Sequence, residues 1–237
     1  MTAMAKNPKV SVVILTKNSE KVIGDCLNAV FNQTFKDLEA IIVDGNSTDK
    51  TIDIVKSTPA KIVMEEGKGK KRFSYARNLG VRAAKGNMIA FVSSDCVPEK
   101  NWLEKLIEPL GGKVVATFGR QVFVGEDEDG PGSKVLGKYI SLRMGKMFDG
   151  EFPPWYYSTV NSSVKRKIVK DLGWFDEGLK ACEDQDLGFR IVEKGYKIKY
   201  CPNAIVYNRE TTKPIVYVKK RMGDLKEFEK VKRRYLK

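Results

Sequence analysis

The feature that most constrains the fold is an alternation of short apolar runs with helical patterns over the first hundred residues. The runs are rich in β-branched residues and lie at 9–15, 38–43, 61–64 and 88–92. Such short, continuous runs are typical of strands buried on both faces of a sheet. A helical pattern follows each run: apolar residues at helical spacing lie at 22–30, and further helices are predicted at about 52–55, 73–84 and 98–106, the last beginning at Pro98. The alternation therefore predicts a mostly parallel, Rossmann-like α/β sheet flanked by helices.

Polar clusters stand where three of these strands end. They are Thr16-Lys17-Asn18, Asp44 to Asp49, which includes Asn46, and Ser93 to Asp95. Ligands of doubly wound sheets bind at the carboxyl ends of the strands, so we expect the three clusters to converge on one edge. Ser47 or Thr48 can also cap the helix that follows the second cluster.

The pattern changes in the second half of the chain. We expect a strand at 114–124, an acidic glycine-rich loop at 125–132, helices at 165–172 and 184–194, and strands at 197–200 and 204–207. Without an internal repeat or a clear linker, one domain over 1–212 is the economical arrangement. Its two halves would be about 1–110 and 111–212, and a basic amphipathic helix would follow at 213–237.

The composition is that of a folded protein without histidine. Hydrophobic residues make up 42% of the chain and charged residues 31%, an ordinary globular balance. The absence of histidine excludes Ser-His and Cys-His catalysis, so proton transfer falls to Asp, Glu, Lys, Tyr or Cys. The four cysteines lack a CxxC spacing, which argues against zinc and indicates reduced thiols. Nothing resembles a signal peptide or a membrane span, so we expect a cytoplasmic protein, or a soluble piece of a longer parent.

The net charge of +13 calls for an anionic partner: nucleotide phosphates, nucleic acid or an acidic membrane. The region 213–237 contains ten Lys or Arg residues and three acids, and its apolar residues form one stripe: Ile215, Val218, Met222, Leu225, Phe228 and Val231. This helix could lie on an acidic membrane, or its stripe could dock on the rest of the protein. A nucleic-acid-binding protein is suggested by charge alone; it leaves the three clusters unexplained, and no nucleic-acid motif is present.

Five motifs in a fixed order carry a family resemblance. They are VVILTKN at 12–18, VDGNSTD at 43–49, ARNLG at 76–80, FVSSD at 91–95, and GWFDE at 173–177 followed by EDQDL at 183–187. In this order they resemble family 2 of the inverting glycosyltransferases, over about 9–207. The resemblance implies a GT-A fold, a nucleotide-sugar donor bound by the first half, and an acceptor bound by the second.

The resemblance also implies roles at the nucleotide. Asp44 would contact the base, although an Asp here can simply cap the following helix; Thr16, Asn18 and Asn46 belong to the same binding clusters. Arg77 would lie beside the nucleotide and brace Asp44 or a phosphate. The lysine-rich loop at 67–72 could gather over the diphosphate or be solvated.

Ser93-Ser94-Asp95 stands where relatives usually have Asp-x-Asp. By resemblance, Asp95 would bind a divalent cation, Mg²⁺ or Mn²⁺, that bridges the diphosphate. Ser93 is a weaker ligand and could instead bond the ribose. Asn208 replaces a histidine that helps hold the metal in many relatives, so we expect a weaker metal site.

Asp184 matches the catalytic base of the family, which takes the proton of the acceptor hydroxyl. Alternatively, Asp184 is an acid that only stabilises the first turn of a helix. Glu183 would orient a neighbour or the acceptor, and Asp186 would be structural. Two aromatic groups are harder to assign: the run 155–157 could form an acceptor platform or belong to the core, and 174–175 would pack behind the catalytic helix.

The donor and acceptor are less constrained. By resemblance a UDP-sugar is favoured and a GDP-sugar is possible, while the acceptor could be a glycan, a lipid phosphate or a lipid-linked glycan. Two enzyme-related alternatives stay open: a catalytically impaired nucleotide-sugar-binding protein, suggested by Ser93 and Asn208, and a sugar nucleotidyltransferase.

Overall fold

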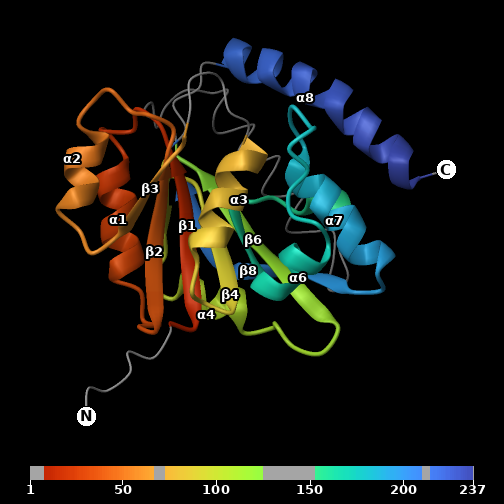
Figure 1. Cartoon of the computed structure of the whole chain (residues 1–237), viewed down its shortest axis with the longest axis horizontal. Helices are drawn as coiled ribbons and strands as arrows, with labels where there is room; N and C mark the ends of the chain where they lie inside the picture. Colours follow the sequence, from red (N-terminus) through yellow and green to blue (C-terminus); the bar gives the residue numbers. More distant parts are fainter. Residues whose placement is uncertain (1–7, 67–72, 125–152, 210–213, 237) are drawn as a thin grey trace.

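The computed structural model describes residues 8–66, 73–124, 153–209 and 214–236. A single eight-stranded mixed sheet forms the centre, and helices cover both of its faces (Figure 1). The strand order is β3 (Lys61–Met64), β2 (Leu38–Asp44), β1 (Val10–Thr16), β4 (Met88–Val92), β7 (Asn161–Lys165), β6 (Val114–Phe123), β8 (Lys197–Asn208) and β5 (Cys96–Pro98).

The strands of the first half pair as the sequence predicts. Strands β3, β2, β1 and β4 are parallel, so their carboxyl ends share one edge of the sheet. Strand β7 then runs antiparallel to both β4 and β6, β6 and β8 are parallel, and β5 is antiparallel to β8. The sheet is therefore parallel over β3, β2, β1 and β4 and mixed beyond β4.

The side chains of β1 alternate between two cores. Val12 and Ile14 belong to a cluster with α1 (Ile23–Phe31), α2 (Thr51–Lys56) and α4 (Trp102–Ile107). Val13 belongs to the opposite cluster, with α3 (Phe73–Ala83), α6 (Arg166–Asp171) and α7 (Glu183–Glu193). Helix α3 approaches β1 closely because Gly80 lacks a side chain: a Cβ there would lie 2.4 Å from Val13 Cγ1. Both faces of the sheet are thus buried, which explains its continuous apolar strands.

Two further helical elements lie near α7. The short helix η1 (Pro154–Tyr156) packs against it, and α8 (Pro214–Tyr235) runs beside it at the upper right of Figure 1. Within the described residues, no helix is long and apolar enough to cross a membrane. All four cysteines are free thiols, as predicted.

The structure corrects several local predictions. Pro98 ends β5 instead of starting a helix, and α4 begins at Trp102. The sequence does not predict strand β7, and the two strands predicted at 197–200 and 204–207 are one, β8. Neither Ser47 nor Thr48 caps α2, whose N-cap is Lys50 without a side-chain bond. The loop predicted at 125–132 and the lysine loop at 67–72 lie outside the described residues.

Candidate functional site

The tips of β1 and β2 form the first part of the site. Thr16 and Asp44 are partners in the parallel register of these strands. Asp44 is fully buried, and its carboxylate accepts hydrogen bonds from the Ser47 backbone N–H at 2.8 Å and from the Ser47 hydroxyl at 2.5 Å. The carboxylate therefore closes the turn after β2 in this structure, and its contact with a base stays a prediction.

Two asparagines tie the loops after β1 and β2 together. Asn18 and Asn46 adopt left-handed backbone conformations, with φ of 49° and 60°. The Asn18 side-chain oxygen accepts the Thr48 N–H at 2.8 Å, and the Ser47 hydroxyl accepts the Asn18 N–H at 2.8 Å. Asn46 donates to the Glu65 carbonyl at 3.3 Å. These predicted binding residues thus also build the rim of the sheet edge.

Asp95 and Asn208 are brought together by β5 and β8. Cys96 pairs with Asn208 in the antiparallel register, and the Arg209 N–H donates to the Asp95 carbonyl at 2.9 Å. Asn208 is buried at 4% exposure. The described residues contain no group of three or more Cys, Asp or Glu that could hold a metal ion. One carboxylate and one amide oxygen nevertheless fit Mg²⁺ or Mn²⁺ when phosphates and water complete the shell, because Mg²⁺ usually binds in this way.

Asp184 lies in the first turn of α7 and is 9% exposed. Its Oδ2 accepts the Thr159 N–H at 3.2 Å, and its Oδ1 accepts the Gln185 N–H at 3.0 Å. Burial, followed by the negative charge of Glu183, raises the pKa of the Asp184 carboxyl from 3.8 to about 6, against the opposing effect of Arg77 and the two N–H donors. A carboxylate with this pKa is ionised at neutral pH and is a stronger base than an exposed Asp.

The three acids of this turn differ in their partners. Glu183 is paired with Arg77, and Asp186 with Arg190 at 2.7 Å. Among the described residues, Asp184 has no cationic partner within salt-bridge distance and is held by neutral donors. Asp184 is thus the acid of this turn that is free to accept a proton without breaking an ion pair.

The sequence predicts that Arg77 braces Asp44 or a phosphate. In the structure it pairs with Glu183 instead of Asp44, and its contact with a phosphate stays a prediction. Its guanidinium pairs with Glu183 and lies over the Phe73 and Phe175 rings, with its Cζ 5.5 and 5.9 Å from their centroids. Arg77 and Glu183 can pair because the helices that carry them, α3 and α7, cover the same face of the sheet. Glu183 therefore orients a neighbour, as expected, and that neighbour is Arg77.

A chain of contacts links the predicted clusters along one edge. The Ser19 and Ser94 hydroxyls are 3.3 Å apart, which joins the loop after β1 to the Ser93–Asp95 turn. The Ser93 N–H donates to the Val160 carbonyl at 3.2 Å, and the adjacent Thr159 holds Asp184. The three strand-end clusters and the candidate base thus border the same part of the molecule.

Sequence reasoning missed Thr159 and Gln185, because no binding role could be read from the pattern for either residue. Thr16 Oγ1 and Gln185 Oε1 are buried without a hydrogen-bond partner. Thr16 belongs to a predicted binding cluster, and Gln185 follows the candidate base. Buried polar atoms usually have partners, so these two oxygens are candidate contacts for a ligand.

The aromatic run at 155–157 divides between the two predicted roles. Tyr157 is fully buried and belongs to the core, whereas Trp155 is 37% exposed. Trp155 lies on η1, and Gly188 of α7 allows η1 to approach, since a Cβ there would lie 2.5 Å from the Pro154 carbonyl oxygen. Trp155 is therefore the most exposed member of the run, Tyr156 is half-buried, and the role of either as an acceptor platform stays a prediction.

The ARNLG and GWFDE motifs meet behind the candidate base. Asn78 accepts the Phe175 N–H and donates to the Phe175 carbonyl, both at 3.0 Å, and also donates to Glu177 at 2.7 Å. This clamp holds the left-handed Trp174, whose φ is 70°. Phe175 is buried, as predicted, while Trp174 is partly exposed and stacks with Arg82 at 4.8 Å.

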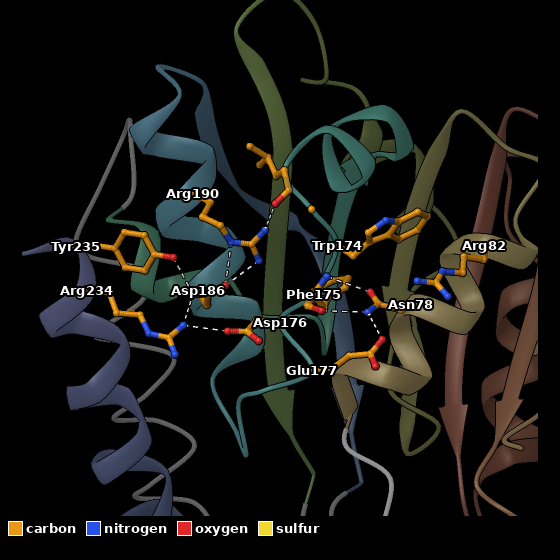
Figure 2. A pocket seen from close by; sticks show the side chains of 12 residues that line it. Asn78, Arg82, Trp174, Phe175, Asp176, Glu177, Asp186, Arg190, Arg234 and Tyr235 are labelled. Carbon is orange, nitrogen blue, oxygen red and sulfur yellow. Dashed lines mark hydrogen bonds and ion pairs between the residues drawn. The ribbon is translucent and has the colours of Figure 1, made fainter. Parts of the chain in front are cut away.

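A cavity of about 440 Å³ lies beside α7, and Figure 2 shows its lining. The lining side chains come from α3, the 172–177 segment, α7 and α8. The predicted site residues do not line it. Asp186 does, bonded to Arg190 and Tyr235 (Figure 2), which agrees with its predicted structural role.

Comparisons with known proteins point in one direction. The family model described as glycosyl transferase family 2 matches residues 11–173. The glycosyltransferase AglE of Haloferax volcanii is 28% identical over 206 residues, which is 84% of this chain and 66% of that protein. A Methanococcus voltae protein is 27% identical over 223 residues, or 87% of this chain and 69% of that one; it is named dolichyl N-acetyl-alpha-D-glucosaminyl phosphate 3-beta-D-2,3-diacetamido-2,3-dideoxy-beta-D-glucuronosyltransferase.

Two solved structures share the fold. The mannosyltransferase PcManGT from Pyrobaculum calidifontis, in complex with GDP-Man and Mn²⁺, has a TM-score of 0.73 at 22% identity, covering 96% of this chain and 65% of that one. S. aureus TarS 1–349 in complex with UDP-GlcNAc has a TM-score of 0.64 at 22% identity, covering 88% and 60%. The chain thus spans between 60% and 69% of the length of these four proteins.

Proposed function

The chain belongs to glycosyl transferase family 2 and has a GT-A fold, and from this premise we propose that it transfers one sugar from a nucleoside diphosphate to an acceptor hydroxyl, inverting C1. The observation that carries the proposal is the state of Asp184. It is a buried carboxylate with a pKa of about 6, held by neutral donors, while the two other acids of its turn are paired with arginines.

In the proposed reaction, Asp184 takes the proton of the acceptor hydroxyl. The acceptor oxygen forms its bond to C1 as the bond from C1 to the diphosphate oxygen breaks, and the nucleoside diphosphate leaves with the electron pair. Burial favours this role because a desolvated carboxylate gains more from accepting a proton than a hydrated one. Glu183 and Arg77 act beside it by setting the charge around the base.

The donor would bind at the edge formed by β1, β2 and β4. Thr16, Asn18, Asp44 and Asn46 would contribute on the side of the base, and their convergence on one edge supports this placement. A UDP-sugar is favoured by the family resemblance, and a GDP-sugar is possible. The two solved structures of similar fold contain one donor of each kind, GDP-Man and UDP-GlcNAc.

The diphosphate would lie near the turn at Ser93. Asp95 and Asn208 would hold Mg²⁺ or Mn²⁺, and Ser93 would bond the ribose. When bound, the cation supplies neutralisation of the charge on the diphosphate. The adjacency of the β5 and β8 ends supports this pair, and the Mn²⁺ bound in the mannosyltransferase complex is consistent with it.

The acceptor would be a glycan, a lipid phosphate or a lipid-linked glycan. The dolichyl phosphate in the name of the Methanococcus voltae relative favours a lipid-linked acceptor. The basic helix α8 would then contact an acidic membrane on its cytoplasmic side. Flotation with anionic liposomes tests this contact, and binding that does not depend on α8 would contradict it.

The central experiment measures donor binding and turnover together. A thermal-shift panel of nucleoside diphosphates and sugar nucleotides, with and without Mn²⁺, identifies the donor because a bound ligand raises apparent stability. Asp184→Asn should keep donor binding and lose transfer. Wild-type transfer rates in this variant would reject Asp184 as the base.

The same assays separate the alternatives. An impaired binding protein would bind the donor without turnover by the wild-type chain. A nucleotidyltransferase would release pyrophosphate instead of a nucleoside diphosphate. Salt-sensitive binding of nucleic acid without any response to sugar nucleotides would indicate the third class.

A further inference from the structure

Helix α8 contacts α7 and the segment before it on both sides of Asp184. In the segment that precedes Asp184 in the chain, Leu179 forms a cluster with the fully buried Val231 of α8. In the same segment, the Cys182 thiol donates to the Asp224 carbonyl of α8 at 3.6 Å. After the base, Tyr235 of α8 reaches Asp186 and Phe189. The apolar stripe of α8 therefore docks on the domain at Val231, while Leu225 is 58% exposed. Residues 215, 218 and 222 of the stripe lie outside the described side chains.

The start of α7 has few supports of its own: Asp184 accepts the Gln185 N–H at 3.0 Å, and Asp186 pairs with Arg190 of the same helix at 2.7 Å. Its N-cap residue, Cys182, has a left-handed backbone with φ of 65° and makes no side-chain capping bond. An N-cap side chain normally satisfies one of the free N–H groups of the first turn and stabilises a helix by about 1 kcal/mol. Three acids occupy this turn, where the positive end of the helix dipole favours them, but the negative charge of Glu183 acts on the adjacent Asp184. Contacts from outside the helix therefore add to the support that the turn has from its own residues.

Helix α8 contacts the first turn of α7 at Asp186. The Tyr235 hydroxyl donates to Asp186 Oδ1 at 2.8 Å, and Arg234 lies 3.5 Å from the same oxygen while donating to Asp176 at 2.9 Å. Figure 2 shows Tyr235 and Arg234 converging on Asp186 from α8. The Tyr235 ring also stacks on Phe189, with centroids 5.0 Å apart and planes 5° apart.

The geometry of the helix explains how a contact on Asp186 acts on the orientation of Asp184. Residues i and i+2 of an α-helix lie about 200° apart around its axis, so Asp184 and Asp186 point to opposite faces. A contact on Asp186 therefore restrains the rotation of the first turn without touching Asp184 itself.

We propose that α8 is a working part of the active site, in which Tyr235 and Arg234 are positioning residues that fix the orientation of Asp184 through Asp186. This inference rests on the proposed function, in which Asp184 is the general base. Misplacing a reacting group by about 1 Å can cost up to 100-fold in rate, so a loosened turn lowers kcat more than donor binding.

The first experiment compares kcat with donor affinity. The double variant Arg234→Gln/Tyr235→Phe should lose roughly tenfold in kcat while the donor Kd changes less than about twofold. Arg233→Gln is the matched control, because it removes the same charge from an exposed neighbouring position on α8. Arg234→Lys with Tyr235 intact should recover most of the rate. Equal kcat values for the double variant and the Arg233→Gln control would overturn the proposal.

The second experiment needs no substrate. The Asp184 carboxyl is titrated by carbon-13 NMR in the wild-type chain and in the double variant. Its surroundings are Glu183 on α7, Arg77 on α3, Tyr157 after η1, and Cys182 before α7. Because those groups are unchanged, a shift toward the ordinary value of an Asp reports water entering a loosened turn. An unchanged titration would overturn the positioning role, and absence of turnover in the wild-type chain alone would instead overturn the proposed function.

Discussion

Replacing Asp184 by asparagine should stabilise the fold while abolishing transfer. Burial and Glu183 raise the pKa of Asp184 from 3.8 to about 6, so the folded state holds a proton that the unfolded chain has already released between these pH values. The contribution of Asp184 to stability is thus fully present below about pH 4 and is lost as pH rises through 6. A shift of about two units corresponds to roughly 3 kcal/mol above pH 6.

Asparagine keeps the shape and one acceptor oxygen, for the Thr159 N–H, and carries no charge. Its NH₂ group cannot accept the Gln185 N–H that Asp184 Oδ1 accepts, and this lost hydrogen bond offsets about 1 kcal/mol of the gain. The free energy of unfolding of Asp184→Asn should therefore exceed that of the wild-type chain at pH 7.5 by up to about 2 kcal/mol. For a domain of this size that corresponds to roughly 4–8 °C in Tm. The difference should shrink as the pH falls from 6 to 4, because the wild-type carboxyl then becomes neutral in the folded state.

Thermal unfolding followed by circular dichroism between pH 4 and 8 measures this difference. Asp53→Asn serves as the control, since it removes an equal charge from an exposed position on α2. A Tm gain for Asp184→Asn that is the same at pH 4.5 and pH 7.5 would refute the reasoning, because only a buried carboxylate with a raised pKa makes the gain depend on pH.

Three further outcomes follow from the site. Glu183→Gln removes the negative charge that raises the pKa of Asp184, so the acid limb of the kcat profile should move to lower pH; an unmoved limb would contradict their coupling. Asp95→Asn should weaken donor binding in Mn²⁺ at least tenfold, yet leave binding in EDTA unchanged, as measured by calorimetry; equal losses in both would argue against a metal role. Gly188→Ala places a Cβ 2.5 Å from a backbone oxygen of η1 and should cost about 1–3 kcal/mol in urea unfolding, whereas Gly111→Ala, with nothing within 4 Å of the new Cβ, should not.

The sequence predicts strands β1 to β4 well because they are apolar on both faces. Strands β1 to β4 begin and end within a residue of their predicted bounds. The strand β7 escapes prediction because it opens with Asn161-Ser162-Ser163, which are polar yet buried. Their partners come from distant segments: the Asn161 oxygen accepts the Trp102 indole N–H, and the Ser163 hydroxyl lies 2.7 Å from that of Thr117. Only tertiary contacts make this segment a strand.

The candidate site, like the fold, is predictable from the sequence only in part. Asp184 is visible in the sequence because it lies at the start of a helix within a motif, and the structure buries it, while its role as the base stays a prediction. Its supports are invisible there, because Thr159 lies 25 residues away and Arg77 lies 106 residues from Glu183. Pairwise contacts over such separations leave no periodic trace in a single sequence.

The unequal pairing of the three acids links the stability of α7 to its chemistry. Glu183 and Asp186 each have an arginine, and the positive end of the helix dipole favours all three acids in the first turn. An arginine on Asp184 as well would lower its pKa and stabilise the fold, but it would also make the carboxylate a poorer proton acceptor. Because Asp184 has only neutral donors, its ionised form lowers the stability of the fold by roughly 3 kcal/mol. The ion pairs of Glu183 and Asp186, and the contacts of α8 with this turn, offset that loss. In the proposed mechanism, the residues that stabilise this turn and the residue that accepts the proton are therefore different ones, and α8 contacts Asp186 and not Asp184.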